Sequence, residues 1–524
     1  MKRRTLLTMA ATTLAAPRIG NAQAARPVRF VHDADIAVLD PVATTNYQTR
    51  DHAFMVFDTL YGQDNAYRAR PQMVAGHVTE NDGRIWKLTL REGLAFHDGS
   101  KVLARDAVAS VARWGKRDSY GQALMARVDE LSAPDDRTIQ FRLQSPFPLL
   151  PDALAHFSPS MCAIMPTRLA ETDAYKPVSE MVGSGPFRFK TDERVSGSRV
   201  VYEKFAGYMP RDEPAECTAG GKVVHIERVE WHILPDASMI ANALTTGEVD
   251  WWMAPSADLL PLLRKSRNIA FPILSPSGVI ATMRFNQLQP PFDNPAIRRA
   301  ILHAVRQSDY MTAVLGEDRA NWRDGVGYFC PDTPMASNAG MENLAGPLDM
   351  VAARKELDAA GYRGERVVLL MPTDIPRFRT LAEVTADFMQ KLGMSVESQP
   401  MDLATMVQRR GKQEPLDQGG WSVFHTTFGG PDQFNPAVHA YLRGNGRAGI
   451  MGWPASTRIE ELRDAWFATS DLAAQKKAAE QLQLQAFQDV PYIPLGQWRL
   501  PTAHRTDLQG MLTGLPLFWN IRRV

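Results

Sequence analysis

A tight turn at residues 183–187 is the feature that most constrains how this chain can fold. Gly183 and Gly185 flank a serine, and Pro186 follows them directly. Glycine permits close backbone approach and proline fixes one backbone angle, so the chain must reverse sharply here. Residues 187–189 read Phe-Arg-Phe, which alternates as a half-buried strand does. The pattern predicts that the turn leads the chain into a sheet.

Strand and helix patterns alternate along the rest of the chain. Runs typical of strands fall at residues 28–31, 86–91, 138–143, 223–233, 279–285, 367–371, 396–401 and 492–499. Helical spacing of apolar residues falls at residues 106–112, 239–244, 296–305, 350–360, 381–392 and 473–487. Thr380 and Glu383 fit a capping box, so a helix is expected to begin at Thr380. Residues 500–524 read as an irregular tail. The alternation indicates a mixed α/β protein, and 524 residues are too many for one core, so two or three domains are expected.

The N-terminal residues have the three parts of a secretion signal. Residues 2–4 are basic, residues 6–16 are apolar, and Ala22-Gln23-Ala24 fits the small-x-small cleavage rule. A signal peptide is therefore expected at residues 1–24. Arg3 and Arg4 also resemble a twin-arginine signal, and that route and the general secretory route both stay open. No later apolar run approaches about 18 residues, so no transmembrane helix is expected and the protein should be periplasmic.

Charge and cysteine content exclude several classes of partner and cofactor. The net charge is +1, which gives no basis for a nucleic-acid partner. There are three cysteines, and in an oxidising compartment Cys217 and Cys330 could pair or could both remain free. No Cys-x-x-Cys or His-Glu-x-x-His motif occurs, so we expect no metal and no other cofactor.

Six short motifs occur in an order that resembles the family 5 extracellular solute-binding proteins, the dipeptide, oligopeptide and nickel receptors of ABC importers. The turn at residues 183–187 is one of them, since it resembles the family's Gly-(Thr/Ser)-Gly-Pro-(Phe/Tyr). The others lie at residues 39–41 (Leu-Asp-Pro), 57–60 (Phe-Asp-Thr-Leu), 96–99 (Phe-His-Asp-Gly), 243–250 (Ala-Leu-Thr-Thr-Gly-Glu-Val-Asp) and 293–300 (Asp-Asn-Pro-x-x-Arg-x-Ala). The similarity covers essentially all of residues 27–500.

The resemblance implies an α/β, two-lobed periplasmic-binding-protein fold, class II-like, with an extra subdomain inserted in the first lobe. Lobe I is expected at residues 25–276 and 490–524, with the insertion at about 62–180, and lobe II at residues 277–489. Two strands would cross between the lobes, near residues 274–285 and 488–496. A small-molecule ligand would lie between the lobes of a monomer that docks on an ABC permease in the inner membrane.

The segment from Trp421 to Phe434 is the expected floor of the ligand site. It combines an apolar strand with a loop rich in hydroxyl, aromatic and glycine residues, and such loops at strand ends often contact ligands. The candidates are Trp421, His425, Thr426, Thr427, Phe428 and Asp432, with a place in the core as the favoured alternative for Trp421. In peptide-binding members the position of Thr427 resembles that of an aspartate that pairs with the ligand's ammonium. A hydroxyl supplies no charge, which argues against a free-amine peptide. Asp432 is the nearest acid, or it is a turn residue after proline.

Three further residues complete the expected site. Arg379 precedes the expected helix start at Thr380, where an arginine and free backbone amides would bind a carboxylate. It resembles the arginine that pairs with the peptide carboxylate in dipeptide receptors; alternatively it is solvated or bridges to Glu383. Thr45 and Tyr47 follow the Leu-Asp-Pro motif, where the first lobe of the family often contacts ligand.

These features favour a periplasmic substrate-binding component of an ABC importer. The expected cargo is a small organic solute, either a carboxylate-bearing compound or a peptide. No Gly-x-Ser-x-Gly motif and no P-loop occurs, so we expect no enzymatic activity. A subunit that presents ligand to a membrane receptor is the alternative, and an exported enzyme is a more distant one.

Overall fold

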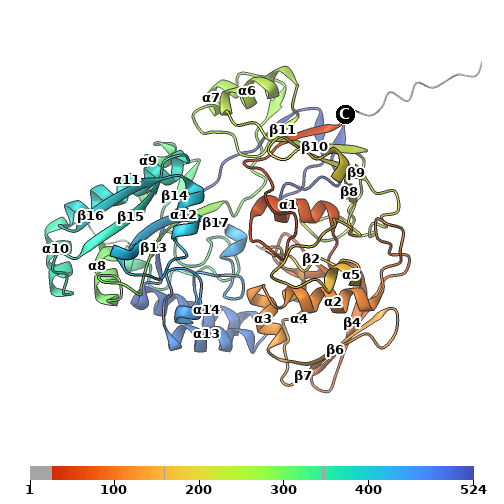
Figure 1. Ribbon diagram of the computed structural model, residues 1–524, viewed down its shortest axis with the longest axis horizontal. Helices are drawn as coiled ribbons and strands as arrows, with labels where there is room; N and C mark the ends of the chain where they lie inside the picture. The colour runs from red at the N-terminus through yellow and green to blue at the C-terminus, as the bar shows by residue number, and fades with distance from the viewer. Residues whose placement is uncertain (1–25, 159, 345–348) are drawn as a thin grey trace, which may run out of the picture.

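Two mixed β-sheets divide the chain into two lobes (Figure 1). The computed structural model describes residues 26–158, 160–344 and 349–524. The expected signal peptide at residues 1–24 lies outside them. Within the described residues, no helix combines the length and the apolar character needed to cross a bilayer.

Lobe I is built on a seven-stranded sheet in the order β12-β19-β11-β1-β10-β9-β8. Strand β1 pairs in parallel with β10 and β11, and the pairings of the outer strands are antiparallel. The strands are β1 (Val28–Val31), β8 (Phe187–Phe189), β9 (Arg199–Lys204), β10 (Arg228–His232), β11 (Trp251–Trp252), β12 (Ile269–Ala270) and β19 (Ala503–Arg505). The helices of this lobe are α1 (Tyr47–Val56), α5 (Thr167–Ala170), α6 (Ala237–Thr246) and α7 (Leu260–Leu263), and two short hairpins join β2 (Tyr61–Gln63) to β3 (Ala69–Pro71) and β20 (Leu508–Gln509) to β21 (Arg522–Arg523).

A separate antiparallel sheet lies within the range expected for the inserted subdomain. Its order is β4-β5-β7-β6, and three helices accompany it. The elements are β4 (Val74–Glu80), β5 (Ile85–Leu90), α2 (Ala104–Trp114), α3 (Ser119–Met125), β6 (Val128–Ser132), β7 (Thr138–Leu143) and α4 (Leu150–Ala155). Figure 1 shows α3 and α4 facing the helices α13 and α14 of lobe II. Ring contact between Tyr120 and Phe467, 5.7 Å apart, confirms that the two parts touch.

Lobe II is built on a six-stranded sheet in the order β14-β18-β13-β17-β15-β16. Its strands are β13 (Val279–Phe285), β14 (Trp322–Arg323), β15 (Arg366–Pro372), β16 (Ser395–Met401), β17 (Val423–Gly429) and β18 (Tyr492–Trp498). Its helices are α8 (Pro295–Ala304), α9 (Gln307–Leu315), α10 (Met350–Ala359), α11 (Pro376–Lys391), α12 (Leu403–Arg409), α13 (Thr457–Phe467) and α14 (Leu472–Asp489). Asn294 and Asp349 cap α8 and α10, since their side chains accept backbone N–H bonds at the starts of these helices.

The two chain crossings between the lobes lie side by side. The first runs from Ala270 to Val279, and the second follows Trp498, which is paired with Val279. The expected return to lobe I at residue 490 is wrong, because β18 pairs with β13 inside the lobe II sheet. The expected irregular tail is also wrong in part, because β19 at residues 503–505 pairs with β11 and β12. The partners that make these residues a strand lie more than 200 residues away.

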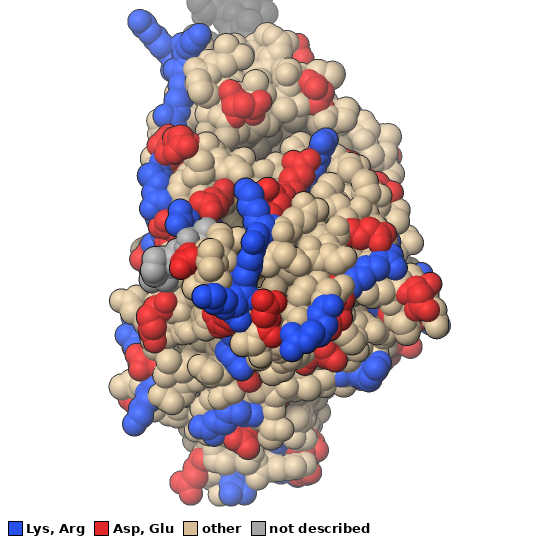
Figure 2. All heavy atoms as spheres, turned by 90° about the vertical axis from the view of Figure 1, so that its left-hand side faces the viewer, with Lys and Arg blue, Asp and Glu red and all other residues tan. Residues whose placement is uncertain are grey.

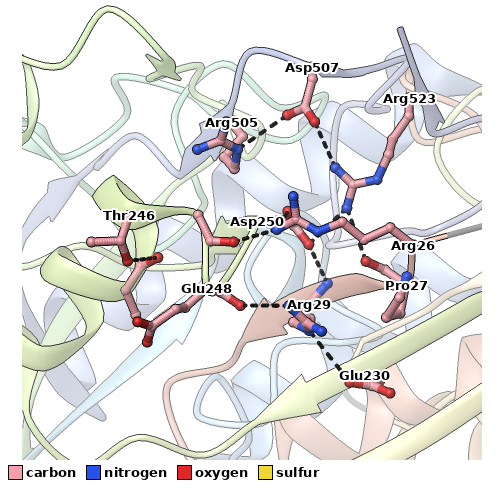
Figure 3. A network of polar contacts seen from close by, with 12 residues as sticks. Arg26, Pro27, Arg29, Glu230, Thr246, Glu248, Asp250, Arg505, Asp507 and Arg523 are labelled. Carbon is pink, nitrogen blue, oxygen red and sulfur yellow. Dashed lines mark hydrogen bonds and ion pairs between the residues drawn. The ribbon is translucent and has the colours of Figure 1, made fainter.

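A buried carboxylate holds the start of the described chain against its end (Figure 3). Asp250 is fully buried and forms ion pairs with Arg26 at 3.1 Å and Arg523 at 2.9 Å. It also accepts the Arg29 backbone N–H at 2.9 Å, while Arg523 continues to Asp507 at 2.7 Å. Asp250 is the last residue of the motif at residues 243–250. That motif therefore joins the two ends of the described chain beside the lobe I sheet.

All three cysteines are free buried thiols in this structure. The pairing of Cys217 with Cys330, one of the two alternatives left open by the sequence, is therefore wrong here.

Candidate ligand-binding site

A network of charged side chains lies where the carboxyl end of β1 meets α1. His32 directly follows β1, and its two ring nitrogens face the carboxylates of Asp33 and Asp51, the latter at 3.2 Å. Arg50 pairs with the other oxygen of Asp51 at 2.9 Å. All but Asp33 are buried. The carboxyl ends of parallel strands are where α/β proteins bind ligands, so this position suits a ligand-binding role.

The network is continued from lobe II by Asp432. The Tyr47 hydroxyl on α1 donates to the Asp432 carboxylate, and the Gly429 N–H donates to the Tyr47 oxygen at 2.9 Å and to Asp432 at 3.0 Å. Burial raises the pKa of Asp432 to about 6, although Tyr47 and Arg50 oppose the rise. We call His32, Asp33, Tyr47, Arg50, Asp51 and Asp432 the junction network. Because Tyr47 and Asp432 belong to different lobes, the network links them directly.

The charge of His32 predicts how stability depends on pH. Burial disfavours the imidazolium, but Asp33 and Asp51 outweigh it and raise the pKa of His32 to about 9. The stabilisation is therefore complete below pH 6.5 and is lost as pH rises from about 6.5 to 9. Thermal unfolding should show the midpoint falling by a few degrees over this range. His32→Gln should remove that part of the slope, and an identical slope in both proteins would refute the assignment.

The expected residues on β17 divide between the junction and the lobe II core. Thr426, Thr427 and Phe428 are half-buried near the end of the strand. His425 instead faces the interior: its Nε2 meets the Thr385 hydroxyl at 2.8 Å, and burial lowers its pKa to about 3. Trp421 is also fully buried. The Trp421 ring packs on Phe424 and Trp453, so both His425 and Trp421 lie in the lobe II core.

The structure changes the argument for Arg379. The helix α11 begins at Pro376, so the capping box expected at Thr380 is wrong and Arg379 lies one turn into the helix. Its exposed side chain pairs with Glu383 at 2.8 Å. Proline at a first helical position was the better boundary signal. Arg377 lies in the first turn of α11, 6.0 Å from the Trp498 ring. Desolvation opposes the shift, but His32 and, as a smaller contribution, the exposed Arg377 lower the pKa of Asp33.

The two candidate residues in lobe I lie in different environments. Tyr47 lies in the junction network, whereas Thr45 is exposed in the turn before α1. Sequence reasoning missed His32 and Asp33, although their place at the end of a predicted strand was a usable signal.

A pocket of about 520 Å³ opens between the inserted subdomain and lobe II. We call it the subdomain pocket. Tyr67 and Phe434 stack at its wall with ring centroids 4.7 Å apart, one from each side. Leu149, Met335 and Trp466 add apolar surface. Polar side chains also line it, namely Gln63, Arg68, Asp152, Asn435, Ser470 and Gln475. A concave space that combines apolar walls with polar groups is the usual form of a small-molecule site. Nothing in the sequence indicated it, because its walls come from segments hundreds of residues apart.

Two lobes joined by paired crossings, with a pocket between them, define a two-lobed solute-binding protein. The family model described as bacterial extracellular solute-binding proteins, family 5 Middle, matches residues 68–447. The chain belongs to this family.

Two relatives are similar in sequence to this chain over almost its whole length. The probable peptide ABC transporter periplasmic-binding protein y4tO of Sinorhizobium fredii is 35% identical over 98% of this chain and 97% of its own. The glutathione-binding protein GsiB of Salmonella typhi is 24% identical over 95% of each chain.

Solved structures share the fold. AgaA from A. tumefacien R10, in complex with agropinic acid, has a TM-score of 0.78 at 20% identity, covering 95% of this chain and 99% of its own. The dipeptide-binding protein from Pseudoalteromonas sp. SM9913 with Met-Leu has a TM-score of 0.77 at 20% identity, covering 95% and 100%. At this identity the likeness establishes the two-lobed fold.

Proposed function

We propose that this protein captures a small, peptide-like organic solute between its lobes in the periplasm and delivers it to an ABC permease. The observation that carries the proposal is the subdomain pocket, which lies between two lobes that also meet through Tyr47 and Asp432. The y4tO relative's name supports a peptide importer. We propose no covalent chemistry for the site and no resident cofactor.

Capture requires that the lobes move, and the crossings suit a hinge. Gly278 lies in the first crossing with a left-handed φ of +54°, and a Cβ there would lie 2.2 Å from the Trp498 carbonyl oxygen in the second. Only glycine fits such a position without strain. Two short, adjacent connections restrict the motion to opening and closing of the lobes about one axis.

The charge distribution on the outer face of lobe II indicates which kinds of partner the protein can bind there. Figure 2 shows basic and acidic side chains interspersed over this face, without a broad field of one sign. Nucleic acid would require a basic surface. We propose that the partners of the protein are its cargo and the permease, and that it acts as a monomer.

Arg377 is the residue we propose for the carboxylate of the cargo. Arg377→Ala should weaken cargo binding tenfold or more, about 1.4 kcal/mol, because a charge-assisted contact is lost. Arg379→Ala is the matched control, since it lies two residues away on the same helix and its exposed pair with Glu383 is worth little. Isothermal titration with the identified cargo compares them. Equal losses, or a loss only in Arg379→Ala, would contradict the proposal.

The decisive test of the function is the identity of the cargo. The protein purified from its own periplasm should retain a small mass in native mass spectrometry, and deletion of the protein should abolish uptake of that compound. Loss of a signalling response with uptake intact would instead indicate a sensor subunit.

A further inference from the structure

Most acidic residues around the junction already have partners. Asp432 accepts from Tyr47 and Gly429, and Asp51 pairs with His32 and Arg50. The remaining pairs are Asp33 with His32 and Gln48, Asp64 with Arg68 and Arg70, and Asp118 with His156. Each of these carboxylates already has at least one side-chain partner, although Asp432 keeps one buried oxygen, Oδ1, without a hydrogen-bond partner among the described residues.

Asp152 differs from them because, among the described residues, no side chain bonds to its carboxylate. It lines the subdomain pocket from α4, it is half-buried, and it has no ion-pair partner among the residues that the structure describes. The pocket's own cation, Arg68, is held by Asp64 at 3.1 Å. Burial raises the pKa of Asp152 to about 6, and nearby backbone amides offset only part of the rise. A carboxylate with no cation beside it in an apolar pocket destabilises the protein, so its presence calls for a function.

A second polar group in the same pocket also lacks a partner. Tyr120 is 1% exposed and lines the pocket, yet its hydroxyl makes no hydrogen bond to any described residue. Buried hydroxyls are nearly always satisfied, so an occupant is expected to supply the missing bond. The apolar walls around Tyr120 and Asp152 suit an aromatic or branched group.

We propose that the subdomain pocket receives an apolar group carrying a protonated amine, such as the first residue of a short peptide, with Asp152 binding the ammonium. Tyr120 supplies a hydrogen bond, and Tyr67, Phe434 and Trp466 enclose the apolar part. The proposal rests on the proposed function and names its cargo. It also accounts for the uncharged Thr427, because the ammonium is bound by the inserted subdomain instead of β17.

Calorimetry with the dipeptide Phe-Ala and with N-acetyl-Phe-Ala tests this on the full chain freed of cargo. The free amine should bind at least tenfold tighter than the acetylated peptide. Asp152→Asn should remove that preference while leaving the affinity for N-acetyl-Phe-Ala unchanged. Asp129→Asn is the matched control, since this acid is exposed on the same subdomain and pairs with Arg142. Equal binding of the two peptides, or no saturable binding of Phe-Ala, would overturn the proposal.

Two readouts separate a binding role from a structural one. Asp152→Asn should unfold at the same or a higher temperature at pH 7, because the ionised carboxylate disfavours folding above pH 4. In the unaltered protein, affinity for Phe-Ala should fall between pH 7 and pH 5, while affinity for N-acetyl-Phe-Ala should stay flat. A flat profile for both would refute the assignment. A retained cargo without an amine would also refute it, but would leave solute capture intact.

Discussion

Asp40→Ala is expected to lower the free energy of unfolding by about 3–5 kcal/mol, because it leaves a buried arginine without its counterion. Asp40 is buried and accepts two bonds from Arg113, at 3.1 and 2.7 Å. It also accepts the backbone N–H groups of Val42 and Val178, each at 2.9 Å. The guanidinium is only 2% exposed, so water cannot replace the lost carboxylate.

Urea unfolding followed by circular dichroism measures the effect. Glu80→Ala is the control, because Glu80 and Lys87 form an exposed pair at a similar distance, 2.8 Å, and should cost less than about 1 kcal/mol. Asp40→Asn should fall between them, since it keeps the shape but loses the charge. If Asp40→Ala cost no more than Glu80→Ala, the pair would not stabilise the fold.

Two further acids of the sequence motifs share this structural role. Besides Asp40, Asp58 is paired with Lys222 at 2.7 Å in the interior, and Asp250 with Arg523 at 2.9 Å. These acids can be recognised in the sequence because they belong to motifs. Their basic partners lie 73, 164 and 273 residues away, and neither periodicity nor spacing identifies those partners. The motifs therefore predicted the family, and these three acids stabilise the fold.

Local signals were reliable where local energetics decide the outcome. Asn294 caps its helix because its side chain accepts the backbone N–H of the residue two positions later. Both partners therefore lie within one short stretch of sequence. The start of α11 was missed because two local signals competed, and Pro376 prevailed over Thr380. Tyr47 and Asp432 were both candidates, yet only the fold brings them together across 385 residues. Asp152 and Tyr120 gave no signal, since neither forms part of a recognisable motif.

Gly183→Ala and Gly185→Ala are each expected to destabilise the protein by about 1–3 kcal/mol, at the upper end of the cost of overpacking a rigid site. A Cβ at Gly183 would lie 2.1 Å from the Val56 carbonyl oxygen, and one at Gly185 would lie 2.6 Å from the Val56 carbonyl carbon. Both obstacles are backbone atoms at the end of α1, so no side chain can move aside to relieve the clash.

The cost is high because the turn bonds both to the end of α1 and to the motif at residues 96–99. The Gly185 N–H donates to the Val56 oxygen at 2.9 Å, and the Gly183 oxygen accepts the His97 N–H at 2.8 Å. His97 also meets the Gly185 oxygen through its ring at 3.0 Å. A shift that made room for a methyl group would break these bonds and leave buried polar groups unsatisfied. The turn therefore fixes α1, and with it Tyr47 and Arg50, against the lobe I sheet.

Gly76→Ala is the matched control, because a Cβ there meets nothing within 4 Å. It should change stability by less than about 0.5 kcal/mol. Urea unfolding of the three variants compares them directly. A change in Gly183→Ala as small as that in Gly76→Ala would mean that the turn yields freely. The sequence motif would then report only the conformation of the turn, and the junction residues on α1 would owe their positions to other contacts.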